Sequence, residues 1–330
     1  VLGVAHDRSG RGPCDRAPAA IVTPGRRPTL VTLTLPRQSR DAVTVSDVTS
    51  PTADALPPLI APSLGPTSLK QRPWGGRRLA RIRAEHLPAD APADAIWGES
   101  WEFSTLVGSK SRALGRDLEE LLGAPLPFLA KLIDTEKALS IQVHPEDDAK
   151  AGTLGKEEAW IILDAAPGAA VLAGLREGVD APQLKGLAEA AWANADEGGP
   201  ELVGALQRIE VKRGDVILVP GRTVHAIQGG ILLAEIQQPT DCTYRLFDYG
   251  SNRQIHPEQA LATIDPMARP GLWTRGQSAS GEKLAGRHVK LSIHTGPEDL
   301  ELSHPGAPAL LVCVDGPVEV KAGEITETLA

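Results

Sequence analysis

The sequence predicts a mainly β protein that carries one helical insertion and a second, incomplete β domain near its C-terminus. Short runs of β-branched and aliphatic residues, bounded by Gly, Pro and Asp turns, recur between residues 96 and 247. Between about residues 181 and 206 the apolar residues change to helical spacing. Two further strand-like segments, 289–293 and 309–314, open the second β domain.

Length and composition are those of an ordinary soluble protein with a large core. The chain has 330 residues and a mass of 34.8 kDa, with 42% hydrophobic and 23% charged residues. A net charge of −8 argues against nucleic acid or an anionic membrane as the main partner, because both bind basic faces. A phosphorylated small molecule stays compatible with this charge, since one phosphate needs only a few local donors.

Cysteine content and hydropathy indicate the cellular compartment. Cys14, Cys242 and Cys313 are far apart and lack any C-x-x-C spacing, which argues against a disulfide framework and against a thiolate zinc site. No apolar run approaches the roughly 18 residues needed to span a bilayer, and no signal segment precedes the first strands. We therefore expect a cytoplasmic protein that is not embedded in a membrane.

Composition divides the chain into three parts. Residues 1–57 are rich in Pro, Arg, Ser, Thr and Ala, with only short apolar groups such as 30–35, which predicts a disordered N-terminal extension. Residues 58–270 form the main β domain, and 271–330 form a second β domain with too few strands to close a sandwich. Because the chain starts at Val1, we expect either a fragment or an N-terminal extension. Because the last domain lacks strands, we expect a truncated C-terminus.

One stretch, residues 214–227, places a histidine at the end of a short strand. A Gly-Asp turn precedes four aliphatic residues, a Pro-Gly bend follows them, and His225 comes just after the bend. A histidine on backbone held by turns at both ends is suited to metal binding. Taken alone, it is more often a hydrogen-bonded structural residue.

A second group of polar residues could meet His225. Gln142 and His144 are two apart on a predicted strand and so face the same side, and Glu158 begins the next strand. Nitrogen and oxygen ligands without thiolate suit Zn²⁺, and also Fe²⁺, Mn²⁺ or Co²⁺. A polar strand face, a turn carboxylate and a loop histidine remain the alternative interpretation of these residues.

Several motifs, in their order and spacing, resemble the cupin-fold mannose-6-phosphate isomerases over about residues 58–330. They are residues 74–76, 98–102, 139–145, 155–160, 214–227 and 235–248. The resemblance implies a cupin (jelly-roll) β-sandwich as the catalytic domain, with one Zn²⁺ per chain held by Gln142, His144, Glu158 and His225. It also places four residues in or near the active cleft: Lys156, Glu235, Asp241 and Arg245.

The reaction implied by this resemblance is the interconversion of mannose 6-phosphate and fructose 6-phosphate through an enediol. Arg245 could stabilise the enediol oxygens, or it could form a salt bridge with Asp241 or Asp248. Lys156 or Glu235 could move protons, and the sequence does not distinguish them. The alternatives are another metal-dependent cupin, such as an Fe²⁺ oxygenase, and a non-catalytic sugar-binding cupin.

Two segments depart from the family pattern. Gly221-Arg222 stands where family members usually have Ala-Gly, so a charged residue lies in the His225 loop. The residues after Ser104 also differ from the family pattern, so the residues that bind the phosphate are not fixed by the resemblance. The segment is either a solvated basic loop or a set of hydrogen-bond donors for the phosphate. That candidate set for the phosphorylated hexose is Ser109, Lys110, Ser111 and Arg112. The oligomeric state is not predicted.

Overall fold

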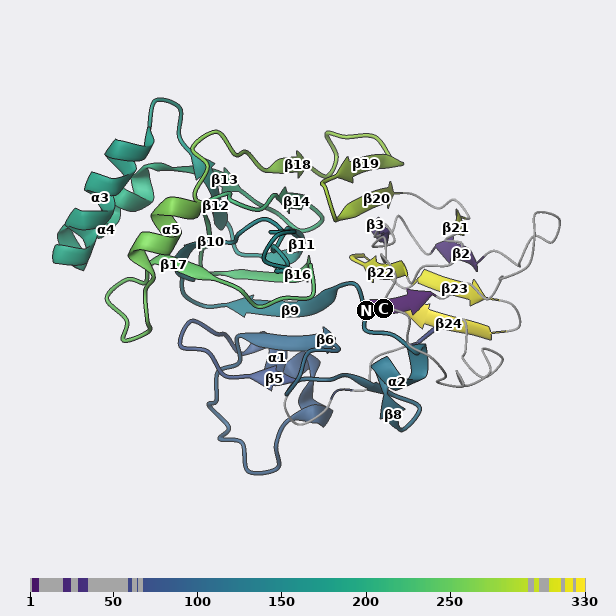
Figure 1. Cartoon of the computed structure of the whole chain (residues 1–330). Helices are drawn as coiled ribbons and strands as arrows, with labels where there is room; N and C mark the ends of the chain where they lie inside the picture. Colours follow the sequence, from purple (N-terminus) through teal and green to yellow (C-terminus); the bar gives the residue numbers. More distant parts are fainter. Residues whose placement is uncertain are drawn as a thin grey trace.

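The computed structural model describes residues 2–5, 20–24, 29–34, 59–60, 64, 68–295, 300–302, 309–315, 318–322 and 325–329. Within these ranges the chain is built mainly of β-sheets, with a helical layer on one side, as the sequence predicts (Figure 1). None of the helices in the described ranges combines the length and the apolar character needed to cross a bilayer.

The main β domain contains two sheets that pack face to face. From one edge to the other, the larger sheet runs β18 (Gly271–Trp273), β14 (Val216–Val219), β11 (Glu158–Ala165), β16 (Ile231–Gln237), β9 (Leu129–Thr135), β6 (Glu99–Phe103) and β5 (Leu69–Lys70). The smaller sheet runs β13 (Leu206–Glu210), β12 (Ala170–Leu175), β15 (His225–Ile227), β10 (Ile141–Val143) and β17 (Tyr244–Phe247). Trp160 and Leu233 of one sheet pack with Val171 and Ile227 of the other, which makes the pair a sandwich.

Helices cover the outer face of the smaller sheet (Figure 1). They are α3 (Ala181–Ala193), α4 (Ala195–Gly204) and α5 (Pro257–Thr263). The first two confirm the predicted helical insertion, and α3 begins with a capping box between Asp180 and Gln183. Leu184 and Ala188 of α3 pack on Ile141 in the sheet.

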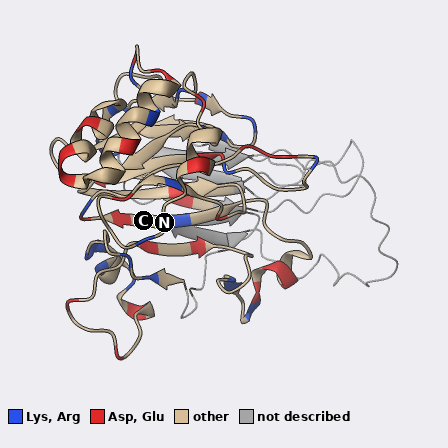
Figure 2. Ribbon diagram, turned by 60° about the vertical axis from the view of Figure 1, so that its left-hand side comes forward, with Lys and Arg blue, Asp and Glu red and all other residues tan. Residues whose placement is uncertain are grey.

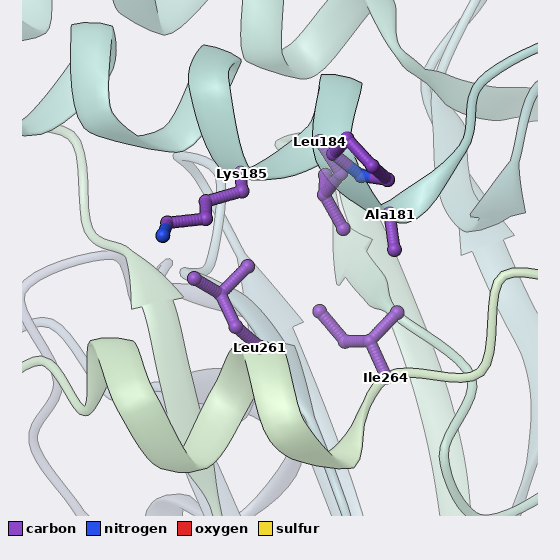
Figure 3. A pocket seen from close by; sticks show the side chains of 6 residues that line it. Ala181, Leu184, Lys185, Leu261 and Ile264 are labelled. Atoms are coloured by element: carbon purple, nitrogen blue, oxygen red, sulfur yellow. The ribbon is translucent and has the colours of Figure 1, made fainter.

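An apolar pocket of about 350 Å³ opens between α3 and α5 (Figure 3). It is lined by Ala181, Pro182, Leu184, Lys185, Leu261 and Ile264. These residues belong to the helical layer, so the pocket does not reach the space between the two sheets.

The chain enters the main domain through several small elements, and a buried carboxylate caps the first of them. They are α1 (Arg78–Ile82), the 3-10 turn η2 (Ala84–His86), β7 (Arg112–Ala113), β8 (Arg116–Asp117) and α2 (Leu118–Leu122). Asp134 accepts hydrogen bonds from the backbone N–H groups of Arg78 and Leu79 and thereby caps α1. A Cβ at Gly76 would come within 2.6 Å of the Asp134 carboxylate, so this glycine allows the chain to pass.

The second β domain packs on the outer face of the larger sheet, through Leu291, Ile293 and Leu310. One of its sheets runs β19 (Glu282–Ala285), β20 (Lys290–Thr295), β3 (Thr29–Thr34), β22 (Ala309–Cys313), β1 (Leu2–Ala5) and β4 (Leu59–Ile60). The other runs β21 (Leu300–Leu302), β2 (Ala20–Pro24), β23 (Val318–Ala322) and β24 (Ile325–Leu329).

The N-terminal segment therefore differs from the disordered extension expected over residues 1–57. Three strands of that segment, β1, β2 and β3, pair with C-terminal strands, and β3 lies between β20 and β22. The alternation of aliphatic residues and Thr over 29–34 has the β propensity for this pairing. The other residues of 1–57 lie outside the described ranges.

Candidate metal centre

Three ligating side chains meet between the two sheets. Glu158 is the first residue of β11 in the larger sheet, whereas His144 directly follows β10 and His225 opens β15 in the smaller one. One ligating atom from each residue lies within 4.8 Å of the others, and all three side chains are buried. Strand alternation explains why His144 and His225 point inward, because their chain neighbours Val143 and Ala226 face the helices on the other side of the sheet.

Backbone carbonyls orient both imidazoles. His144 Nδ1 lies 2.8 Å from the carbonyl oxygen of Cys242, and His225 Nδ1 lies 2.8 Å from that of Thr223. Each Nδ1–H therefore donates outward, which leaves the lone pair of Nε2 directed at Glu158, 3.5 Å away for His144 and 3.3 Å for His225.

Burial keeps both imidazoles neutral. Burial and the Lys156 cation hold the pKa of His144 well below its usual range, and burial lowers the pKa of His225 to about 4. At neutral pH both rings are thus in the neutral form, with Nε2 free of a proton, that binds metals.

The Glu158 carboxylate fits a metal ion better than it fits an empty protein interior. Both of its oxygens are buried without a well-aligned hydrogen bond among the described residues, although Lys156 Nζ lies 3.0 Å from Oε2. Burial raises the pKa of Glu158 to about 7, against the opposing charge of Lys156. An anionic group with so little compensation is destabilising, and a cation between the three ligands would offset it.

Gln142 reaches the same centre with its amide nitrogen. It pairs with His225 across the β10–β15 ladder, and its Nε2 lies 3.3 Å from His225 Nε2. Its Oε1 accepts a hydrogen bond from Ser140 Oγ at 3.0 Å. Ligation through oxygen would need the amide turned by about 180°, which exchanges the positions of its oxygen and nitrogen atoms.

A row of polar side chains runs from this centre across the inner face of the larger sheet. Glu235 stands opposite Trp160 on one side and Lys131 on the other, and Lys131 stands opposite Trp101. Lys131 Nζ lies 3.0 Å from Glu235 Oε1 and 2.7 Å from Gln237 Oε1. Lys131 was not among the residues expected from the sequence, and a lone lysine inside the apolar run 128–133 is the signal that marks it.

Lys156 and Glu235 carry opposite charges beside the centre. Burial favours the neutral amine of Lys156, but Glu158 and Glu235 together raise its pKa above the usual range. Burial likewise favours the neutral acid of Glu235, but the ammonium groups of Lys131 and Lys156 hold its pKa below the usual range. Both groups are therefore ionised at neutral pH.

Arg245 and Asp241 lie at the edge of this arrangement. Arg245 on β17 stands opposite Gln142, and among the described residues its buried Nε has no hydrogen-bond partner. Asp241 has a side chain that is 61% exposed, and one of its oxygens is 4.0 Å from Lys131 Nζ.

The four residues expected to bind phosphate do not converge. Lys110 pairs with Glu119 at 2.7 Å, Arg112 donates to the carbonyl oxygen of Gly115, and the buried Ser111 hydroxyl donates to the carbonyl oxygen of Glu102. Ser109 differs, because its hydroxyl accepts a hydrogen bond from Lys70 Nζ at 2.8 Å.

Lys70 joins Ser109 to the polar row. Its ammonium lies 4.3 Å from the centroid of the Trp101 ring, and that of Lys131 lies 5.0 Å from the same centroid. Two cations thus share one indole at the end of the row away from the histidines.

Arg222 connects the His225 loop to the helical layer. Its backbone takes the left-handed conformation, with φ of 66°, and its Nε donates to the carbonyl oxygen of Thr263 at the end of α5. Its N–H donates to the carbonyl oxygen of His144 at 2.7 Å. The side chain is therefore a tether between a metal-binding loop and α5.

Two packed sheets with a buried His–Glu–His centre between them define a β-sandwich protein of the cupin type that can hold a divalent metal. Residues 66–164 match the family described as phosphomannose isomerase type I, catalytic domain. The chain is 32% identical over 227 residues to the mannose-6-phosphate isomerase ManA of Bacillus subtilis (strain 168). This match covers 61% of this chain and 67% of that protein. The chain belongs to the mannose-6-phosphate isomerase family.

Other relatives agree with this assignment. The chain is 33% identical over 221 residues to the probable mannose-6-phosphate isomerase GmuF of the same bacterium, covering 59% of this chain and 65% of that protein. It thus spans about two thirds of the length of these relatives. The crystal structure of the mannose 6-phosphate isomerase from Bacillus subtilis has the same fold, with a TM-score of 0.55 at 23% identity over 77% of this chain and 98% of that one.

Proposed function

We propose that this chain is a zinc-dependent isomerase that interconverts mannose 6-phosphate and fructose 6-phosphate. The observation that carries the proposal is the pair of neutral histidines whose Nε2 atoms face the Glu158 carboxylate between the sheets. The relatives of this chain bear the name mannose-6-phosphate isomerase, and one solved structure of such an isomerase is described as holo and zinc bound.

The donor set suits this metal. His144, Glu158 and His225 would hold zinc through two imidazole nitrogens and a carboxylate, and Gln142 would complete the set after rotation of its amide. When bound there, zinc would polarise the substrate carbonyl and stabilise negative charge on the enediol oxygens.

Proton movement is assigned to the charged pair beside the centre. Isomerisation removes a proton from C2 of the aldose and delivers a proton to C1, so the site needs one group that accepts and one that donates. Glu235 is ionised and can accept a proton, whereas Lys156 stays protonated and can donate a hydrogen bond or a proton to a substrate oxygen. Arg245, whose Nε lacks a partner among the described residues, supplies a further fixed positive charge to the enediol.

We further propose that one of the two β domains is catalytic. Residues 58–270 carry all of the residues named above and would form the catalytic domain. Residues 271–330, together with β1, β2, β3 and β4, would form the second domain, except for β18 (Gly271–Trp273), which belongs to the larger sheet of the main domain. We also propose a cytoplasmic location, which fits three widely separated cysteines without C-x-x-C spacing and which cell fractionation would test.

A coupled assay that detects fructose 6-phosphate formed from mannose 6-phosphate tests the function, alongside metal analysis of the purified protein. We expect one zinc per chain and turnover that stops on chelation and returns with Zn²⁺. Folded, zinc-loaded protein without turnover would favour a non-catalytic sugar-binding cupin. Bound iron with oxygen consumption would favour an oxygenase.

A further inference from the structure

A buried glutamate next to the metal-binding carboxylate receives three backbone N–H groups from the second β domain. Glu157 Oε1 accepts hydrogen bonds from the N–H groups of His288 and Val289 at 2.8 and 2.7 Å, and Oε2 accepts one from Arg287 at 2.9 Å. These donors belong to the turn between β19 and β20, 130 to 132 residues away in sequence. The Glu157 carboxylate therefore binds the second domain directly.

The contact is specific to this turn. Among the described residues, the Glu157 carboxylate accepts hydrogen bonds from these three N–H groups and forms no ion pair with a Lys, Arg or His side chain. A Cβ at Gly286 would lie only 2.3 to 2.6 Å from the carboxylate atoms, and Gly286 does not have a positive φ. The glycine leaves room for the carboxylate rather than for an unusual backbone conformation.

Glu157 stands between two residues of the metal centre. Because side chains alternate along the chain here, Lys156 and Glu158 face the space between the sheets. Glu157 points to the opposite side, where Ala159 and Val289 belong to the core shared with the second domain.

The backbone of Glu157 is also held in place. Its N–H donates to Gln238 Oε1 at 2.9 Å, and its carbonyl oxygen accepts from the N–H of Gln238 at 3.1 Å. Gln238 Nε2 and the N–H of Gly155 both donate to Asp147 Oδ1, at 2.9 and 2.6 Å. The start of β11 is thus fixed by the neighbouring strand and loop, and by the second domain through Glu157.

We propose that Glu157 is a positioning residue through which the second β domain sets the place of Glu158 and Lys156 in the metal centre. This inference rests on the proposed metal-binding function. Residues that orient metal ligands without touching the metal typically change metal affinity by about 10- to 100-fold when replaced. We expect a loss in that range for Glu157→Gln, because the amide group would turn one N–H donor toward the N–H of Arg287.

The test uses Co²⁺ as the probe, because its visible absorption reports both affinity and coordination. The full chain is stripped of metal and titrated with Co²⁺ as wild type, Glu157→Gln, Glu157→Ala, Gly286→Ala and the double variant Glu157→Ala/Gly286→Ala. Gly286→Ala should weaken Co²⁺ binding in the wild type, because the new methyl group displaces the carboxylate. In the Glu157→Ala background it should change affinity by less than about twofold, because the clash is gone.

Glu102→Gln is the matched control. Glu102 is also a fully buried glutamate, and its carboxylate accepts hydrogen bonds from Arg83 at 3.1 and 2.8 Å, away from the three ligands. Its replacement should lower the melting temperature yet leave the Co²⁺ affinity and spectrum unchanged. Equal Co²⁺ affinity and spectra in wild type, Glu157→Gln and Gly286→Ala would overturn the inference.

The design separates this inference from the proposed function. If Glu157→Gln does not fold, Gly286→Ala alone carries the test, since it leaves every hydrogen-bonding group in the sequence. A wild-type protein that binds Co²⁺ but lacks isomerase activity would count against the proposed reaction only. A wild-type affinity that Gly286→Ala does not reduce would count against the positioning role only.

Discussion

Metal affinity should fall about tenfold for each pH unit below 7. Protons compete with the metal for Glu158, whose pKa burial raises to about 7, so acid weakens binding. At pH 5 the loss is about 100-fold, or about 2.7 kcal/mol, from two pKa units at 1.36 kcal/mol each. The histidines contribute little in this window, because the pKa of His225 is about 4 and that of His144 is well below its usual range.

The number of protons released on binding tests this reasoning. Isothermal titration calorimetry with Co²⁺ at pH 5.5, in two buffers of different ionisation heat, should give about one proton released per metal ion. Ordinary histidines with a pKa near 6.5 would bring the count close to three. A count of two or more, or of zero, would contradict the assigned protonation states. The same titration above pH 8 is the control, since Glu158 is then already ionised and the count should approach zero.

Three further predictions concern single side chains. His225→Ala should lose zinc and activity together, whereas Arg245→Ala should keep zinc and lose at least about 100-fold in turnover. Zinc analysis and the coupled assay check both variants, and full zinc occupancy in His225→Ala would show that His225 is not a ligand. We expect the substrate phosphate to bind Lys70, at the end of the polar row away from the histidines. Lys70→Ala should therefore raise KM for mannose 6-phosphate by about tenfold or more, through loss of a charged hydrogen bond to this phosphate. Lys110, already paired with Glu119, should tolerate replacement by Ala without a change in KM; the reverse result would favour the 109–112 loop as the phosphate site. Arg222→Gly should be more stable than Arg222→Ala by about 1 kcal/mol, because only glycine relieves the left-handed backbone; equal urea midpoints would refute the strain argument.

Local spacing made the residues near the metal centre candidates, and the family resemblance was needed to select them as ligands. Gln142 and His144 share a strand face because they are two residues apart, and His225 follows a Pro-Gly bend that ends a buried strand. The structure brings His144, Glu158 and His225 together, and it places the Gln142 amide beside them. Such patterns can be recognised in the sequence because strand alternation and turn geometry depend on only a few neighbouring residues.

The polar row and the domain contacts could not be predicted in this way. Lys131 meets Glu235 through the β9–β16 register, 104 residues apart in the chain, and Lys70 meets Ser109 across 39 residues. Strand register depends on how whole faces are buried, so a single charged residue in an apolar run does not reveal its partner.

The mainly β architecture and the helical insertion can thus be obtained from residue order, because each depends on periodicity and turns within short segments. Strand order depends on pairings between segments that are not neighbours in the chain. The N-terminal strands in the second β domain and the docking of Glu157 on the β19–β20 turn depend on contacts between segments more than 100 residues apart. Those contacts are selected jointly by packing and hydrogen bonding in the folded chain. The candidate ligands of the metal centre thus lie in local motifs, whereas the turn that binds the Glu157 carboxylate beside them is 130 to 132 residues away in sequence.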